Sequence, residues 1–177
     1  MQNTCGAIVG LIFLVLTNLA IMIAFATPYW LEHRIIQIIN EGLWARCLEN
    51  ECTWYFEENF KFQSQLEEWF KATQALMTVG LVVGLLALLV ATLALCCTCK
   101  NCYPNHVVAV LLVVGFLCVG VAVVVFAVKA SDERTAKLKW DFDNVVRFSW
   151  SFWVAIGAAV LSLVTAVIYS CMNRKYA

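Results

Sequence analysis

Two cysteines in the longest polar break of the chain are the residues whose type and spacing could do chemistry. Cys47 and Cys52 are separated by four residues and follow a Gly-Leu-Trp tripeptide at 42–44. Four residues suit a hairpin turn, and Asn50 tolerates the left-handed backbone that such turns use. Two facing strands would then bring the cysteines within reach of a disulfide. Because a disulfide persists in an oxidising compartment, the spacing predicts that this segment faces outward.

A second group of cysteines gathers at the end of one apolar run, and one more lies near the end of another. These residues are Cys96, Cys97, Cys99, Cys102 and Cys171. Cysteines at a membrane edge are typical palmitoylation sites on the cytoplasmic face. The spacing of Cys99 and Cys102 is also that of a thiol oxidoreductase. A zinc site built from Cys96, Cys97, Cys99 and Cys102 is a further alternative, although a C-x-x-C motif alone is weak. We expect palmitoylation, with no metal, no cofactor and no enzymatic activity.

Four long apolar runs must position these cysteines. They cover about 6–28, 73–97, 107–128 and 148–170. The chain is 63% hydrophobic and only 14% charged, whereas soluble domains average about 25% charged residues. Each run exceeds the roughly 18–20 residues that cross a bilayer core of about 30 Å, and none alternates polar with apolar residues. The sequence therefore predicts an all-α membrane protein with a bundle of four transmembrane helices.

The orientation of the spans follows from the cysteines rather than from the basic residues. The termini and the turn at about 98–106 carry three Lys or Arg, while the two long loops carry nine, so the positive-inside rule does not decide. The predicted disulfide places loop 29–72 outside, and loop 129–147 follows it. The first run is too long for a signal core and lacks a preceding basic residue, so we expect it to be retained. Both termini should then be cytoplasmic.

The first outer loop contains three short segments with strand-like composition. They are HRIIQII (33–39), GLWARC (42–47) and CTWYFE (52–57), and they predict a small extracellular antiparallel β-sheet. The segment 64–73 predicts a helix that Ser64 caps and that continues into the second span or lies on the membrane. Trp30 and Trp44 are expected to pack beneath the sheet.

Other features of the runs indicate packing rather than transport. Small residues one turn apart, Gly6 with Gly10 and Gly80 with Gly84, allow helices to approach closely. Asn18 is expected to hydrogen-bond to another helix. A proton relay or pump would need ionisable groups deep in the membrane, and no run carries one there. Four tryptophans near the outer ends suit an aromatic belt: Trp30, Trp140, Trp150 and Trp153.

The order of residues in the first loop resembles that of the claudin superfamily. The matching residues are Trp30, Gly42, Leu43, Trp44, Cys47 and Cys52. The segment KATQALMTVGLVVG, 71–84, is similar to the start of the second claudin helix. The superfamily includes claudins, peripheral myelin protein with its epithelial relatives, and the gamma subunits of calcium channels. The resemblance covers nearly the whole chain, so we expect one claudin-like domain over 1–177.

This sequence departs from the claudin pattern in three places. The gap between its two loop cysteines is short, Gln74 stands where claudins commonly carry an arginine, and Lys175-Tyr176-Ala177 is a poor match to a PDZ-binding end. We interpret the chain as a divergent claudin-like protein for which scaffold binding by that end is not expected.

The resemblance implies a plasma-membrane protein of cell–cell junctions that mediates adhesion and forms or regulates a paracellular barrier. Its expected partners are membrane lipid, further copies of itself and related four-helix proteins in the same or the opposed membrane. The alternative is an auxiliary subunit of an ion channel or receptor, or a myelin-protein-like membrane organiser. No basic patch suits nucleic acid.

Candidate partner contacts lie in both outer loops. They are Glu49, Asn50, Glu57, Glu58, Trp69, Phe70, Trp140 and Phe142. Loop 29–72 has eight glutamates against four Lys or Arg, a net charge of −4. If the loop lines a pore, Glu57 and Glu58 would favour cations. The alternative is that these glutamates only keep the loop soluble.

Overall fold

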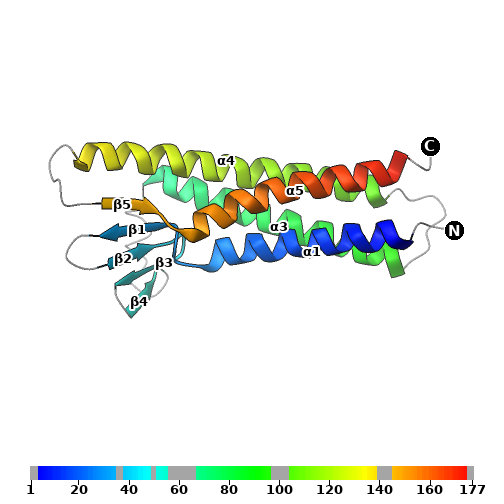
Figure 1. Ribbon diagram of the computed structural model, residues 1–177, viewed down its shortest axis with the longest axis horizontal. Coiled ribbons are helices and arrows are strands. Elements are labelled where there is room, and N and C mark those ends of the chain that lie inside the picture. The colour runs from blue at the N-terminus through cyan, green and yellow to red at the C-terminus, as the bar shows by residue number, and fades with distance from the viewer. Residues whose placement is uncertain are drawn as a thin grey trace.

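Four helices, each long and apolar enough to cross a membrane, dominate the computed structural model, which describes residues 4–34, 38–48, 51–55, 67–96, 104–138 and 145–174. The helices are α1 (Thr4–Ala26), α3 (Glu68–Cys96), α4 (Pro104–Leu138) and α5 (Trp150–Arg174). In the bundle α3 lies between α1 and α4, and α5 lies between α4 and α1. Figure 1 shows both chain ends at one end of this bundle and the strands at the other.

Five short strands form one antiparallel sheet at the end of the bundle opposite the termini (Figure 1). They are β1 (Leu31–Arg34), β2 (Ile38–Glu41), β3 (Ala45–Leu48), β4 (Glu51–Trp54) and β5 (Val145–Phe148), in the order β4-β3-β2-β1-β5. The four helices and this sheet confirm the predicted fold class.

Two details of the predicted first loop are wrong. The segment 33–39, expected as one strand, contains parts of β1 and β2, which pair antiparallel with His33 opposite Ile39. The sheet is also not built from the first loop alone, because β5 comes from the second outer segment and pairs with β1. The predicted helix at 64–73 is helical from Glu68 and continuous with the second span. Ser64 lies outside the described residues.

The second outer segment is shorter than 129–147. Helix α4 has 35 residues, which at about 1.5 Å each make it roughly 52 Å long. This length exceeds the roughly 30 Å of a bilayer core, so part of α4 projects past it. The predicted loop therefore contributes its first ten residues to α4 and residues 145–147 to β5, whose last residue, Phe148, was expected in the fourth span.

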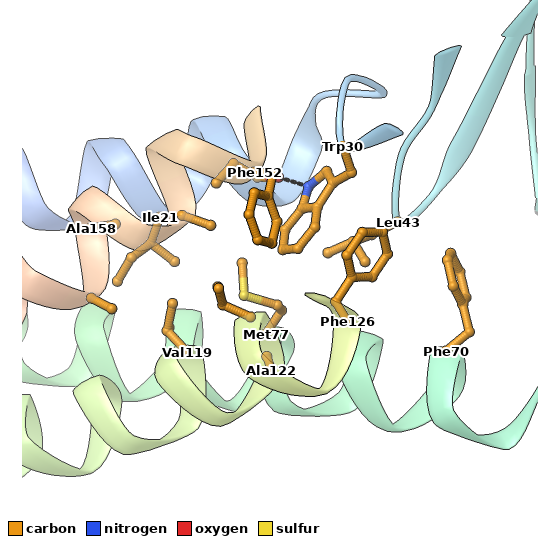
Figure 2. Close-up of a cluster of buried hydrophobic side chains, with 14 of the residues drawn as sticks. Ile21, Trp30, Leu43, Phe70, Met77, Val119, Ala122, Phe126, Phe152 and Ala158 are labelled. Atoms are coloured by element: carbon orange, nitrogen blue, oxygen red, sulfur yellow. Dashed lines mark hydrogen bonds between the residues drawn. The ribbon is translucent and has the colours of Figure 1, made fainter. Parts of the chain in front are cut away.

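The largest hydrophobic cluster lies where the sheet meets the bundle. Its central side chains, Trp30, Leu43, Met77 and Phe126, come from four separate segments and are all fully buried. Figure 2 shows these side chains converging between the helices and the base of the sheet. A second cluster fills the other half of the bundle around Leu14, Leu112 and Tyr169. The sheet thus stands on the same core that holds the helices together.

Polar contacts inside the bundle differ from the expectation for Asn18. Its side-chain nitrogen donates to the carbonyl of Leu14 in its own helix, at 2.9 Å, and not to another helix. The contacts between helices come from hydroxyl groups instead. Those of Thr17 and Thr165 lie 3.2 Å apart, and Ser162 donates to the carbonyl of Leu112 at 2.9 Å.

Glycines permit close contacts between helices at several levels. A Cβ atom at Gly10 would lie 3.3 Å from the ring of Tyr169, and one at Gly80 would lie 2.7 Å from Val119 Cγ2. A Cβ at Gly84 would lie 2.8 Å from Asn18 Oδ1. Gly6 is less crowded, with Met172 4.0 Å from the Cβ position.

Candidate functional site

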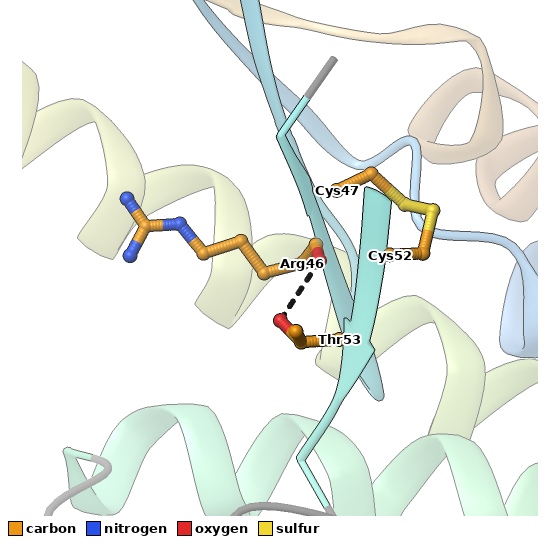
Figure 3. The surroundings of a disulfide bond; sticks show 4 residues. All are labelled: Arg46, Cys47, Cys52 and Thr53. Atoms are coloured by element: carbon orange, nitrogen blue, oxygen red, sulfur yellow. Dashed lines mark hydrogen bonds between the residues drawn. A yellow bond between two sulfur atoms is a disulfide. The ribbon is translucent and has the colours of Figure 1, made fainter. Parts of the chain in front are cut away.

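Cys47 and Cys52 form the disulfide predicted from their spacing. They are opposite each other in the β3–β4 pair, so the hairpin itself brings them together. Figure 3 shows the bond lying on one side of the two strands, with Arg46 and Thr53 projecting from the other side. In this second pair, the hydroxyl of Thr53 donates to the carbonyl of Arg46 at 3.3 Å. Closing such a short loop contributes about 2 kcal/mol to the stability of the hairpin.

Trp30 lies inside the protein at the base of the sheet. Its side chain is 0% exposed, and its indole nitrogen donates to the carbonyl of Ala24 at 2.7 Å. The ring packs edge-on against Phe126 and Phe152, with centroid distances of 4.8 and 5.9 Å. The expected place of Trp30 in an aromatic belt is therefore wrong, whereas packing beneath the sheet is what the structure shows. Trp150 and Trp153, at the start of α5, are exposed.

The Gly-Leu-Trp tripeptide forms the joint between the sheet and the bundle. The Gly42 amide donates to the Ala45 carbonyl at 2.9 Å, and a Cβ atom at Gly42 would collide with the Pro28 backbone. Leu43 is fully buried. The Trp44 ring packs on Phe25 of α1 at a centroid distance of 5.1 Å. Glycine is required here because of the close approach of two backbone segments.

A polar cluster that sequence reasoning missed lies beside this joint. The imidazole Nε2 of His33 is 3.2 Å from Glu41 Oε2, and the Tyr55 hydroxyl lies 3.4 Å from both Glu41 Oε1 and the Gly42 carbonyl oxygen. Burial raises the pKa of Glu41, but the hydrogen bond and charge of His33, with a smaller effect of Arg46, outweigh it and lower the pKa. Burial chiefly, and then Glu41, raises the pKa of Tyr55.

The signal for this cluster was the register of the β1–β2 hairpin. Leu31 is opposite Glu41 and His33 is opposite Ile39, so His33 and Glu41 share one face of the sheet as diagonal neighbours. Treating 33–39 as a single strand concealed this relationship.

Only two of the proposed partner contacts lie in the described residues. Phe70 is 6% exposed and packs against Tyr55 and Phe126, so the expectation of a partner contact there does not fit. Trp69 is half-buried, and its indole nitrogen donates to Glu67 at 3.0 Å. The other candidates lie outside the described residues: Glu49, Asn50, Glu57, Glu58, Trp140 and Phe142.

Three exposed apolar side chains on the sheet were also missed. Ile38 is 49%, Leu48 46% and Trp54 43% exposed. Ile38 and Leu48 stand beside the two hairpin turns at the tip of the sheet, whereas Trp54 pairs with Ala45 near its base. Contiguous apolar patches often mark surfaces that bind other proteins, but these three side chains are separated on the sheet, with Ile38 and Leu48 on opposite faces.

The candidate palmitoylation sites lie at the far end of the bundle. Cys96 at the end of α3 and Cys171 near the end of α5 are both exposed free cysteines, at the end where the termini lie (Figure 1). Cys97, Cys99 and Cys102 are outside the described residues. Within the described part of the chain, no three His, Cys, Asp or Glu side chains gather as a metal site.

Comparisons with known proteins agree with this architecture. Residues 5–169 match the model of the PMP-22/EMP/MP20/Claudin family. Claudin-1 of Mus musculus is 27% identical over 187 residues, which cover 97% of this chain and 87% of the relative. A Danio rerio protein named p53 apoptosis effector related to PMP-22 is 22% identical over 170 residues, covering 96% of this chain and 85% of the relative.

Proposed function

Because the chain belongs to the PMP-22/EMP/MP20/Claudin family, we propose that it acts as an adhesion protein at cell–cell junctions and forms or regulates a paracellular barrier. The chain is a claudin-like multi-pass membrane protein. Its family consists of non-enzymatic membrane proteins. The likeness to claudin-1 over nearly the full length of this chain supports the junctional role.

The observation that carries the proposal is the apolar tip of the sheet. Ile38 and Leu48 lie beyond the membrane, on adjacent strands, and keep about half of their surface exposed. Leu48 is opposite Ile39, so the side chains of Ile38 and Leu48 lie on opposite faces of the sheet and give its tip an apolar group on each side. Covering such side chains with a partner would stabilise the complex by about 25 cal/mol for each Å² of apolar surface removed from water. A tip that points away from the bilayer is placed to meet a protein on the opposed membrane.

The construction of the sheet supports this role. Pairing of β1 with β5 joins the first and second outer segments, and the amide of Ser149 extends the pairing by donating to the Trp30 carbonyl at 3.0 Å. The disulfide closes the β3–β4 hairpin. A platform held at several points orders few new groups on binding, which lowers the entropic cost of association.

The disulfide also supports an orientation in which the sheet is extracellular and both termini are cytoplasmic. In this orientation Cys96 and Cys171 face the cytosol and are available for palmitoylation. Tags on either terminus should bind antibody only after permeabilisation, whereas a tag between β1 and β2 should bind it on intact cells. Labelling of a terminal tag on intact cells would contradict the orientation.

A second candidate is a myelin-protein-like membrane organiser. The Danio rerio relative, whose name relates it to PMP-22, favours this candidate. It requires lateral contacts within one membrane and no binding across the gap between cells.

Imaging of cell contacts separates the two candidates. The tagged protein is expressed in cells that lack junction proteins, once in all cells and once mixed with non-expressing cells. Enrichment only where two expressing cells touch is the expected result. An even surface distribution in both cultures would contradict homotypic adhesion and favour the organiser, and co-purification of a larger channel or receptor would favour an auxiliary subunit.

A matched pair of variants tests the tip. Ile38→Glu with Leu48→Glu places charges on the exposed apolar groups and should remove contact enrichment while leaving surface expression unchanged. Lys129→Glu changes an exposed residue of α4 and should leave enrichment unchanged.

A further inference from the structure

A groove lies on the outward side of α3, next to the joint between the sheet and the bundle. It is a largely open depression of about 470 Å³, lined by Trp44, Lys71, Gln74, Ala75, Thr78 and Val79. Five of the six residues come from α3, and Trp44 supplies the opposite wall from the Gly-Leu-Trp turn. The groove is separate from the tip of the sheet.

The groove spans the boundary between lipid headgroups and hydrocarbon. Helix α3 has 29 residues and, at about 1.5 Å each, is about 43 Å long, more than a bilayer core of about 30 Å. Its first turn carries Glu68 and Lys71, which are costly to bury in hydrocarbon, so this end lies at headgroup level. Val79 lies eight residues after Lys71, about 12 Å deeper along the helix axis.

The chemistry of the groove changes along this direction. At its outer rim the ammonium group of Lys71 lies 3.0 Å from Glu68 Oε1, and the Glu68 side chain is almost fully exposed. At its inner end Ala75 is exposed and Val79 is 47% exposed, offering apolar surface to the bilayer. The middle holds Gln74 and Thr78, whose hydroxyl is already bonded to the Gln74 carbonyl at 2.7 Å.

We propose that this groove binds one zwitterionic phospholipid of the outer leaflet. Lys71 contacts the phosphate, Glu68 contacts the ammonium group of the headgroup, and an acyl chain lies along Ala75 and Val79. The Lys71–Glu68 pair at the rim offers one cation and one anion, which matches a headgroup that carries one charge of each sign. A lone anion is disfavoured by the adjacent Glu68 carboxylate, and a sterol has no charge to match the pair.

The bound lipid would lie against residues that hold the sheet on the bundle. Gln74 donates to the carbonyl of Leu43, and Trp44 packs on Phe25. A lipid that binds only the folded joint stabilises it by mass action. The site thus couples bilayer composition to the stability of the outer sheet, whatever that sheet binds.

Native mass spectrometry of the purified full-length chain tests the proposal. The protein is stripped of lipid in detergent and titrated with phosphatidylcholine. Ala75→Trp fills the groove, and Lys71→Gln removes the cation that contacts phosphate. Val82→Trp adds the same indole to an exposed position deeper on α3, and Lys129→Gln removes an exposed lysine of α4. Size-exclusion profiles and thermal unfolding establish that each variant is folded.

The expected result is one tightly bound phosphatidylcholine per chain, at least tenfold weaker binding to Ala75→Trp and several-fold weaker binding to Lys71→Gln, with both controls unchanged. Equal binding to Ala75→Trp and Val82→Trp would overturn the proposal, as would equal competition by soluble glycerophosphocholine, because the acyl chain would then play no part. Chemical cross-linking supplies a further test. A dimer that forms with the parent but not with Ala75→Trp, while lipid binding stays intact, would also overturn the proposal and assign the groove to a second copy of the chain. Should Ala75→Trp fail to fold, Lys71→Gln against Lys129→Gln decides.

Discussion

The side-chain amide of Gln74 on α3 donates a hydrogen bond of 2.6 Å to the backbone carbonyl of Leu43, in the turn that joins the sheet to the bundle. Both residues are buried, so water cannot replace the bond if it is lost. Gln74 stands where the resembling claudins commonly carry an arginine, and a neutral amide here supplies the donor without placing a charge at the joint. The contact fixes the outer sheet to the second span.

Replacing Gln74 by Ala should destabilise the protein. The Leu43 carbonyl would lose its donor in a buried place, which costs about 1–3 kcal/mol. Thermal unfolding of the purified protein should therefore shift down by several degrees. Thr92→Ala is the control, because the Thr92 hydroxyl is exposed and bonds only within its own helix. An equal shift in both variants would contradict a special role for the Gln74 bond.

Replacing Gly42 by Ala should be more damaging than its size suggests. The new Cβ would meet the Pro28 backbone and lie 2.7 Å from the Thr27 carbonyl oxygen. Backbone atoms at the end of α1 cannot move without disturbing the core, so we expect a loss of about 3 kcal/mol. Surface expression and the unfolding temperature are measured, and both should be lower in Gly42→Ala than in the parent.

Gly157→Ala is the control for the Gly42 substitution. No atom lies within 4 Å of its Cβ position, and alanine in a helix is favoured over glycine by about 0.5–1 kcal/mol. This variant should unfold at the same or a higher temperature than the parent. If Gly42→Ala behaved the same way, the close approach at Pro28 would not be a constraint.

A double-mutant cycle should detect the contact between Asn18 and Gly84. A Cβ at Gly84 would lie 2.8 Å from Asn18 Oδ1, so Gly84→Ala forces the amide to move and endangers its bond to the Leu14 carbonyl. In an Asn18→Ala background the contact with Oδ1 is gone, and the added methyl meets Ile21 Cδ1 at 3.8 Å, an ordinary van der Waals distance. Gly84→Ala should then cost less in that background, by about 0.5–2 kcal/mol in the free energy of unfolding. Strict additivity would show that the two residues do not interact.

The polar cluster at Glu41 should give the sheet an acid-dependent stability. The pKa of Glu41 is lowered from 4.5 in the folded protein. Its stabilising contribution is therefore fully present above about pH 4.5 and is lost as the pH falls through the lowered pKa. Unfolding temperatures measured between pH 7 and pH 3 should fall less steeply for Glu41→Gln than for the parent. The exposed Glu51→Gln should retain the parent slope, and an unchanged slope in Glu41→Gln would contradict the assignment.

The parts of the fold that the sequence predicted are those set by local patterns. The four apolar runs satisfy their backbone only as helices in a bilayer, and the observed helices contain nearly all of them. The Cys47–Cys52 disulfide followed from one hairpin turn. Each of these features depends on residues close together in the chain, so the sequence carried the needed information.

The parts of the fold that the sequence could not predict depend mainly on contacts between distant segments. Strand β5 pairs with β1 across more than one hundred residues, and four residues give no local signal that they belong to a sheet. The division of 33–39 between β1 and β2 is, by contrast, a local hairpin in which Arg34 pairs with Ile38, and the run of apolar residues across it favoured a single strand. Phe70 is aromatic and near the membrane, but only the folded chain shows that Phe126 and Tyr55 bury it.

Docking of proteoliposomes tests homotypic adhesion through the outer sheet most directly, because no other protein is present. The purified chain is reconstituted into two populations of vesicles with different fluorescent labels, with its sheet facing outward. Co-localised vesicles should form when both populations carry the parent protein, and they should be rare when either population is empty or carries Ile38→Glu with Leu48→Glu. Equal docking with empty vesicles, or no docking between two loaded populations, would contradict homotypic adhesion through the outer sheet.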